Sequence, residues 1–165
     1  MRNAFPSPHF HCLHCRGFVS GGFPLAGIRN RNHCPYCLWS RHLDWQSPGD
    51  RLSSCKGAMR PIGLTLKKVR KKYGGTQSGE LMVIHQCVDC RAFSINRIAA
   101  DDGTDILADV FLASQEAGNR IRADLEAWGI RILDHADWNA VSCQLFGRHP
   151  LAGFGSEAAG DEPAR

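Results

Sequence analysis

The chain has 165 residues, of which 43% are hydrophobic, and a formal net charge of +4. This length suits one ordinary domain with a small appendage and excludes two large domains. No apolar stretch approaches the roughly 18 residues that a membrane-spanning helix requires, so an integral membrane protein is excluded and no membrane partner is expected.

The eight cysteines point to metal binding rather than to a disulfide framework. Residues 1–11 contain Pro, His and Phe but no basic-then-apolar signal segment, so we expect a reducing, cytoplasmic setting. In such a compartment paired cysteines usually bind a metal. Redox dithiols are the alternative, but their motifs precede a helix in a βαβ unit, and residues 12–90 lack that pattern.

Between residues 12 and 90, short stretches punctuated by Gly and Pro predict β-hairpins and loops. Pro48-Gly49 suits the central positions of a type II turn. The alternating segments 62–69 and 80–84 flank Gly74-Gly75. They predict a β-hairpin with a long, basic tip.

After Asp102 the apolar residues follow helical spacing instead. Asp134 precedes the third apolar stripe and is expected to cap a short helix that ends near Gly147. The composition from residue 153 onward predicts a disordered tail. The three stripes are Ile106, Leu107, Val110 and Phe111; Ile121, Leu125 and Trp128; and Trp138, Val141 and Leu145.

Seven cysteines have the spacing of zinc ligands. A Cys-x-x-Cys turn supplies two thiolates to a tetrahedral zinc ion, and three such pairs plus Cys55 and one histidine complete two sites. With every ligand supplied by protein, no coordination position stays open, which favours structural zinc over catalytic zinc. Cys143 lies alone in a helical stripe and is expected to be a buried, inert thiol. The pairs are Cys12/Cys15, Cys34/Cys37 and Cys87/Cys90.

The eighth ligand and the pairing of the ligands stay open at this point. His42 is preferred because it completes the Cys-x2-Cys-x4-His spacing of small zinc knuckles, with His85 and then His33 as rivals. In a sequential scheme the first two pairs share one zinc. In a nested scheme the first and last pairs share it, and their common pattern C-x-x-C-R-x-F is compatible with this zinc-ribbon arrangement without deciding between the two schemes. In both schemes the other site includes His42 and Cys55.

The run Arg31-Asn32-His33-Cys34-Pro35 resembles the signature of the RNHCP domain family. The resemblance continues through Tyr36-Cys37-Leu38, Pro48-Gly49-Asp50-Arg51, Cys55-x-Gly57-x-Met59-x-Pro61, His85-x-Cys87-x-x-Cys90 and residues 96–102. It implies a bacterial zinc-binding domain over residues 10–102 but no activity. One departure is that Arg16 and Arg91 stand where a glycine usually follows each knuckle, which makes both turns less relaxed.

These observations predict an α+β protein. We expect an N-terminal tail at 1–9, a small zinc-ribbon-like β-hairpin domain with two structural zinc ions at 10–102, a helical extension at 103–149 and a disordered tail at 150–165. Residues 1–98 carry 15 Lys and Arg against 4 Asp and Glu, whereas residues 99–165 carry 5 against 12. The zinc domain is therefore basic and the extension acidic.

A basic face on a rigid zinc scaffold favours a module that binds RNA or the ribosome. We expect the phosphate-binding residues to be Arg29, Arg31, Arg51, Lys67, Lys68, Arg70, Lys71 and Lys72. The aromatic residues available to stack on unpaired bases are Phe10, Phe18, Tyr36, Trp39, Trp45 and Phe93.

The sequence is compatible with two other functions. The acidic extension suits a protein-interaction adaptor that docks a partner or covers the basic face. A metal-dependent hydrolase or nuclease would gather Asp101-Asp102 with His33 and His85 around Mg²⁺. However, acidic residues before a helix usually cap it, and Asp102 stands where the first helix should begin. We therefore assign no catalytic residue.

Overall fold

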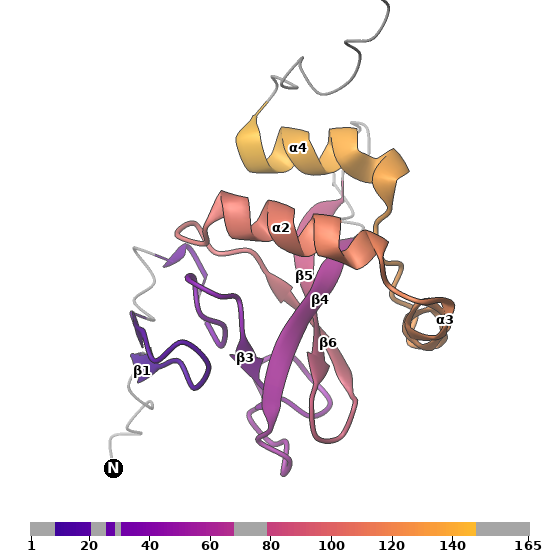
Figure 1. Ribbon diagram of the computed structural model, residues 1–165. Helices are drawn as coiled ribbons and strands as arrows, with labels where there is room; N and C mark the ends of the chain where they lie inside the picture. The colour runs from indigo at the N-terminus through magenta and orange to yellow at the C-terminus, as the bar shows by residue number, and fades with distance from the viewer. Residues whose placement is uncertain (1–8, 21–25, 29–30, 68–78, 148–165) are drawn as a thin grey trace, which may run out of the picture.

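The computed structural model describes residues 9–20, 26–28, 31–67 and 79–147. The chain has the α+β fold that the sequence predicts (Figure 1). In a small antiparallel sheet β1 (Phe10–His11) pairs with β2 (Phe18–Val19). The main antiparallel sheet has the order β3-β4-β5-β6. Its strands are β3 (Ser40–Arg41), β4 (Ala58–Lys67), β5 (Glu80–Cys87) and β6 (Phe93–Arg97).

The predicted hairpin is the centre of the main sheet. Strands β4 and β5 pair from Met59↔Cys87 to Lys67↔Glu80, with a register shift between Pro61 and Gly63. The expected basic tip, residues 68–78, lies outside the described residues. The predicted type II turn is also present, because Gly49 has a φ of 88° and the Asp50 amide donates to the Ser47 carbonyl over 3.1 Å.

The three predicted helices are confirmed as α2 (Thr104–Gln115), α3 (Asn119–Ala127) and α4 (Trp138–Phe146). Asp134 caps not α4 but the 3₁₀ turn before it, η1 (His135–Asp137), through the Ala136 amide. The capping role expected for Asp102 is wrong, because Gly103 is the N-cap of α2 and no side chain bonds there. The carboxylate of Asp102 is bonded elsewhere, as described below.

The helices cover the main sheet on both faces. Side chains alternate along β5, so Val83 packs into one apolar cluster with α2 and α4, and Ile84 packs into another with Leu125 of α3. Figure 1 shows α4 above α2, and β1 to the left of β3. The extension therefore shares its core with the zinc domain. Cys143 is exposed on α4, contrary to the buried position expected for it.

The described helices are all too short or too polar to cross a bilayer.

Candidate metal centres

Each of the three Cys-x-x-Cys pairs lies in the same backbone turn. In each turn the amide four residues after the first cysteine donates to that cysteine's carbonyl, over 3.0, 2.8 and 3.2 Å for Arg16, Leu38 and Arg91. The first cysteine's amide in turn donates to the carbonyl five residues ahead, over 2.8–2.9 Å. These bonds aim both thiols of a pair to the same side, so each turn is a preformed bidentate ligand.

The residue after each second cysteine has a left-handed backbone. The φ angles are 65° at Arg16, 58° at Leu38 and 64° at Arg91. This conformation costs a non-glycine residue about 1–2 kcal/mol. The strain expected at Arg16 and Arg91 is therefore present. Leu38, in the turn before β3, has the same strained backbone.

The first ligand group joins two of these turns. Its four Sγ atoms lie within 4.8 Å of one another, and the pairs Cys12–Cys37 and Cys15–Cys34 are each 3.5 Å apart. Cys12 and Cys34 are buried in a small apolar cluster around Val19, whereas Cys15 is exposed. The group thereby fastens the β1–β2 hairpin to the segment that leads into β3. Its members are Cys12, Cys15, Cys34 and Cys37.

The second ligand group lies at one end of the main sheet. The last residue of β5, Cys87, and the turn that follows it, with Cys90, supply two ligands, and the connection between β3 and β4 supplies His42 and Cys55. The Sγ atoms of Cys55 and Cys87 are 3.6 Å apart, and Nδ1 of His42 is 3.2 Å from Sγ of Cys90. Strand pairing creates this meeting point, since Met59 lies opposite both Ser40 and Cys87.

Gly57 has no side chain, and this leaves space for the second ligand group. Its carbonyl accepts from the His42 amide over 2.9 Å, which holds the two ligand-bearing segments together. A Cβ at this position would lie 3.0 Å from Sγ of Cys87 and would overlap the Asp89 carboxylate. The family resemblance includes Gly57, but nothing in the spacing of the ligands reveals this close approach.

The two groups fit two structural zinc ions. A tetrahedral ion with Zn–S bonds of about 2.3 Å separates neighbouring sulfurs by roughly 3.8 Å, close to the observed separations. Each group supplies four soft or borderline donors, four thiols in one and three thiols with an imidazole in the other. This is the sequential arrangement. The two turns that share C-x-x-C-R-x-F therefore serve different groups, and their similarity reflects a common backbone turn.

The protein environment gives the thiols different acidities when no metal is bound. A hydrogen bond from the Gly17 amide lowers the pKa of Cys15 to about 7. Burial raises the pKa of Cys34 to about 11, and burial likewise raises that of Cys90 to about 11. Since zinc binds thiolates, metal binding at neutral pH must displace protons from Cys34 in the first group and from Cys90 in the second.

The rings of the two rival histidines belong to neither ligand group. His85 is fully buried, and its Nε2 is 2.7 Å from the Leu38 carbonyl oxygen, so that nitrogen carries the hydrogen. Its Nδ1 accepts from Asn96 Nδ2 over 2.9 Å. Burial lowers the pKa of His85 to about 4, which keeps the ring neutral. Both ring nitrogens are therefore engaged in hydrogen bonds, and neither is available to a metal.

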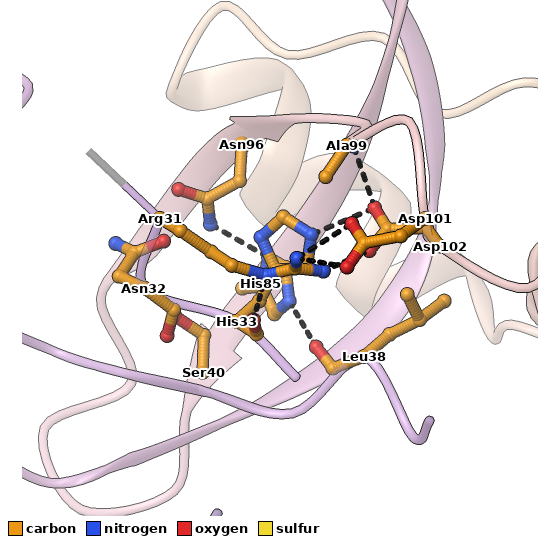
Figure 2. Close-up of polar contacts among 10 residues, drawn as sticks. All are labelled: Arg31, Asn32, His33, Leu38, Ser40, His85, Asn96, Ala99, Asp101 and Asp102. Atoms are coloured by element: carbon orange, nitrogen blue, oxygen red, sulfur yellow. Dashed lines mark hydrogen bonds and ion pairs between the residues drawn. The ribbon is translucent and has the colours of Figure 1, made fainter. Parts of the chain in front are cut away.

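His33 belongs to a buried ionic cluster that joins the start of the RNHCP run to the turn before α2 (Figure 2). Its Nε2 is 2.7 Å from Asp102 Oδ2. Arg31 donates to the other oxygen of Asp102 over 2.7 Å and to both oxygens of Asp101 over 2.6 and 2.7 Å. The Ala99 amide also donates to Asp102. Both carboxylates of the acidic pair are thus bound to Arg31 within the fold.

This cluster changes two expectations. The four residues considered for a hydrolase do gather in space, but Asp101 and Asp102 bind Arg31 instead of presenting free carboxylates to Mg²⁺. Arg31 was expected to bind phosphate. That expectation is wrong, because its side chain is 1% exposed and fully paired.

The other residues that were expected to bind phosphate differ in their exposure and in whether the structure describes them. Lys67 is exposed at the end of β4. Arg51 is half-buried, with its Nε 3.8 Å from Asp44. The remaining five lie outside the described residues: Arg29, Lys68, Arg70, Lys71 and Lys72.

A sequence model of the RNHCP domain matches residues 7–108. The match includes all eight residues of the two ligand groups and runs past residue 102 into α2. No curated protein and no solved structure is significantly similar to the chain.

Proposed function

We propose a function from one premise: the chain belongs to the RNHCP domain family. The zinc-stabilised domain binds RNA, either free or within the ribosome, and acts in the cytoplasm without catalysing a reaction. One observation carries this proposal. Within the described residues, most acidic side chains of the zinc domain form ion pairs or hydrogen bonds inside the fold. Most of its basic side chains are exposed and form no ion pair.

The internal contacts of the acidic residues are specific. Asp44 accepts from the Gly49 and Arg51 amides. Asp50 accepts from four backbone amides of its own loop, which hold its pKa well below the usual range. Glu80 pairs with Arg97, and the Asp101-Asp102 pair binds Arg31. Arg31 and Arg97 offset part of the charge of their partner carboxylates, whereas Asp44 and Asp50 stay ionised and are held against the backbone of their own loop.

Apart from Arg31, Arg51 and Arg97, the basic residues of the zinc domain have no carboxylate partner among the described residues. Six of them are exposed and form no ion pair with any described residue. Two zinc ions with seven thiolates add a formal charge of about −3, which still leaves the domain basic. Exposed cations of this kind bind phosphates and release counterions. The six are Arg16, Arg41, Lys56, Arg60, Lys67 and Arg91.

Aromatic side chains provide a second means of binding single strands. Tyr36 and Trp45 are 62% and 68% exposed, and Phe18 is 55% exposed. Stacking of an unpaired base on such a ring contributes about 1–3 kcal/mol. Two aromatic residues expected to stack are less available, because Phe93 is buried and Trp39 stacks on His14 at 4.3 Å.

The test is the affinity of the zinc-loaded full chain for a labelled, mixed-sequence single-stranded RNA as a function of salt. We expect the logarithm of the association constant to fall linearly with the logarithm of salt concentration. The triple variant R16E/R41E/R60E should bind at least tenfold more weakly, with a slope shallower by about 2, from about 0.7 per lost phosphate contact. Zinc content should be unchanged.

Arg120→Glu supplies the matched control, since Arg120 is an exposed arginine on α3. It should leave both the affinity and the slope unaltered. Absence of RNA binding at low salt would defeat the proposal. Equal losses in the control and the triple variant would remove these three arginines from it.

A protein-interaction role for the extension has its own support. Asp105, Asp109 and Glu116 of the α2 region are exposed and unpaired within the described residues, beside Leu112, which is 52% exposed. This surface would suit a basic partner protein. Capture from lysate at low and high salt, with and without ribonuclease, separates the two roles: partners lost on ribonuclease treatment support RNA binding, and partners retained support the adaptor.

A further inference from the structure

One exposed aromatic ring of the zinc domain is free of contacts with other rings. Trp45 is 68% exposed, and its indole contacts no ring of another described residue. By contrast, Trp39 stacks on His14 at 4.3 Å. The ring of Phe18 lies 5.5 and 5.7 Å from the rings of two histidines.

The three other rings that were expected to stack on bases are covered in part. Phe93 is buried, and Phe10 packs on the apolar cluster of the first ligand group. Tyr36 is 62% exposed, but its ring edge lies close to Gly17, where an added Cβ would be 3.0 Å from Tyr36 Cδ2. Trp45 is therefore the ring that is most open to a stacked base.

The loop that carries Trp45, residues 44–52, is held by two carboxylates and is called the Asp50 loop below. Asp50 accepts from four backbone amides of the loop, two at each oxygen, over 2.9–3.0 Å. The amides of Trp45 and Leu52 bond the same oxygen, so these two residues are neighbours. Asp44 accepts from two further amides over 2.7 and 3.2 Å. These bonds fix the loop before a ligand binds, so stacking on Trp45 does not have to order it.

The charges around the Asp50 loop have both signs. Lys56 is exposed, and its Nζ donates to the Arg51 carbonyl over 3.0 Å. The four amide bonds hold the pKa of Asp50 well below its usual range, so this carboxylate is ionised. Charge alone therefore selects no ligand for the loop. The exposed, uncharged ring of Trp45 is the group that does.

We propose that Trp45 is a stacking platform for one unpaired base of single-stranded RNA, presented by the Asp50 loop. This inference rests on the proposed RNA binding and names the residue through which an unpaired base is bound. Every base has a π-face, so stacking on Trp45 requires no particular sequence. In a duplex the base faces are covered by neighbouring base pairs, so the platform distinguishes single strands from duplexes.

The direct test uses zinc-loaded full chain labelled with 5-fluorotryptophan, which gives one fluorine resonance for each of the four tryptophans. Trp45→Phe identifies the resonance of Trp45. A mixed-sequence single-stranded RNA should move this resonance, whereas a duplex of the same sequence and an abasic strand of the same length should not. The resonances of Trp39, Trp128 and Trp138 should stay in place.

Trp45→Ala should weaken the binding of the single strand about tenfold, from the loss of one stacked base, without changing the affinity for the duplex. Trp128→Ala is the matched control, since Trp128 is 58% exposed but belongs to the extension. It should leave both affinities unaltered. Both variants should retain two zinc ions per chain.

Asp50→Ala tests whether Asp50 acts as a positioning residue for the ring. By charge alone, removal of a carboxylate should strengthen RNA binding. We expect the opposite, weaker binding of the single strand, because the amides of the loop lose their common acceptor. In the double variant W45A/D50A the Asp50 change should cause no further loss, since the ring through which it acts is absent. Tighter binding by Asp50→Ala would refute the positioning role.

The outcomes separate this inference from the proposed function. A single strand that binds without moving the Trp45 resonance, and that binds Trp45→Ala as tightly as the parent chain, refutes the platform and leaves RNA binding in place. An abasic strand that binds as tightly as RNA has the same meaning. Absence of binding by every strand at low salt refutes both proposals. Equal losses for single strand and duplex in Trp45→Ala would overturn the preference for unpaired bases.

Discussion

His42 Nδ1 lies 3.2 Å from Cys90 Sγ, although 48 positions separate the two residues in sequence. The contact exists because β4 pairs with both β3 and β5, which brings the β3–β4 connection against the β5–β6 turn. The second ligand group therefore fastens one end of the main sheet. The first group fastens the β1–β2 hairpin to the segment before β3. Two ions would thus stabilise segments that bury little apolar surface of their own.

His42→Ala should reduce the zinc content from two ions per chain to one, because it removes a ligand of the second group alone. His85→Ala should leave both ions bound, since both nitrogens of His85 are engaged in other hydrogen bonds. Atomic absorption on purified, refolded chains measures the difference. Loss of zinc from the His85 variant with full retention in the His42 variant would show that the eighth ligand is assigned wrongly.

Arg16→Gly and Arg91→Gly should each stabilise the zinc-loaded chain. Glycine relieves a left-handed strain of about 1–2 kcal/mol but costs about 0.5–1 kcal/mol in unfolded-chain entropy, so we expect a net gain of about 0.5–1 kcal/mol. Chemical denaturation in the presence of excess zinc measures this change.

Leu38→Gly is the contrasting case for the same backbone conformation. Its φ is 58°, but its side chain is fully buried in the cluster with Leu64 and Phe111. The lost packing should outweigh the relieved strain, with a net destabilisation of about 2–4 kcal/mol. A lower stability for both arginine variants would mean that the left-handed turns are not strained.

Asp102→Ala should destabilise the chain by about 3–5 kcal/mol, because it leaves buried Arg31 with one carboxylate instead of two and removes the partner of His33. Asp101→Ala should cost about 1 kcal/mol, because the Asp101 side chain is 37% exposed and water can replace it. Equal effects in denaturant titrations would indicate that burial does not control the strength of these pairs.

Gly57→Ala should weaken zinc binding in the second group selectively. The new methyl group would lie 3.0 Å from Cys87 Sγ, and the sulfur can move away only by leaving its position among the ligands. We expect about 10- to 100-fold lower affinity for one of the two ions, equivalent to about 1.4–2.8 kcal/mol of crowding. Competition with a chelator resolves the two affinities.

Gly118→Ala is the control for that substitution, since nothing lies within 4 Å of a Cβ at position 118. Both ions should bind it as they bind the parent chain. Unchanged affinities in the Gly57 variant would show that the second group tolerates a side chain at this position.

Local patterns predicted much of the fold. The alternation around Gly74-Gly75 predicted the β4–β5 hairpin, and the apolar spacing after Asp102 predicted all three helices. The counting of soft ligands likewise predicted two zinc sites, because Cys-x-x-Cys turns are local structures.

The long-range relationships did not follow from the same patterns. The choice between sequential and nested ligand groups depends on which strand ends meet, and local spacing does not encode strand order. Arg31 was expected at the surface because charged residues are usually exposed, but Asp101 and Asp102, some 70 positions away, bury it. The same pairing takes Asp102 away from the cap of α2.

The grouping of the ligands is the central claim, and substitution of zinc by ¹¹³Cd tests it most directly. Correlation of each metal resonance with cysteine β-protons identifies the thiolates bound to each ion. We predict two resonances, one coupled to Cys12, Cys15, Cys34 and Cys37 and the other to Cys55, Cys87 and Cys90. A single resonance coupled to both Cys12 and Cys87 would contradict the account.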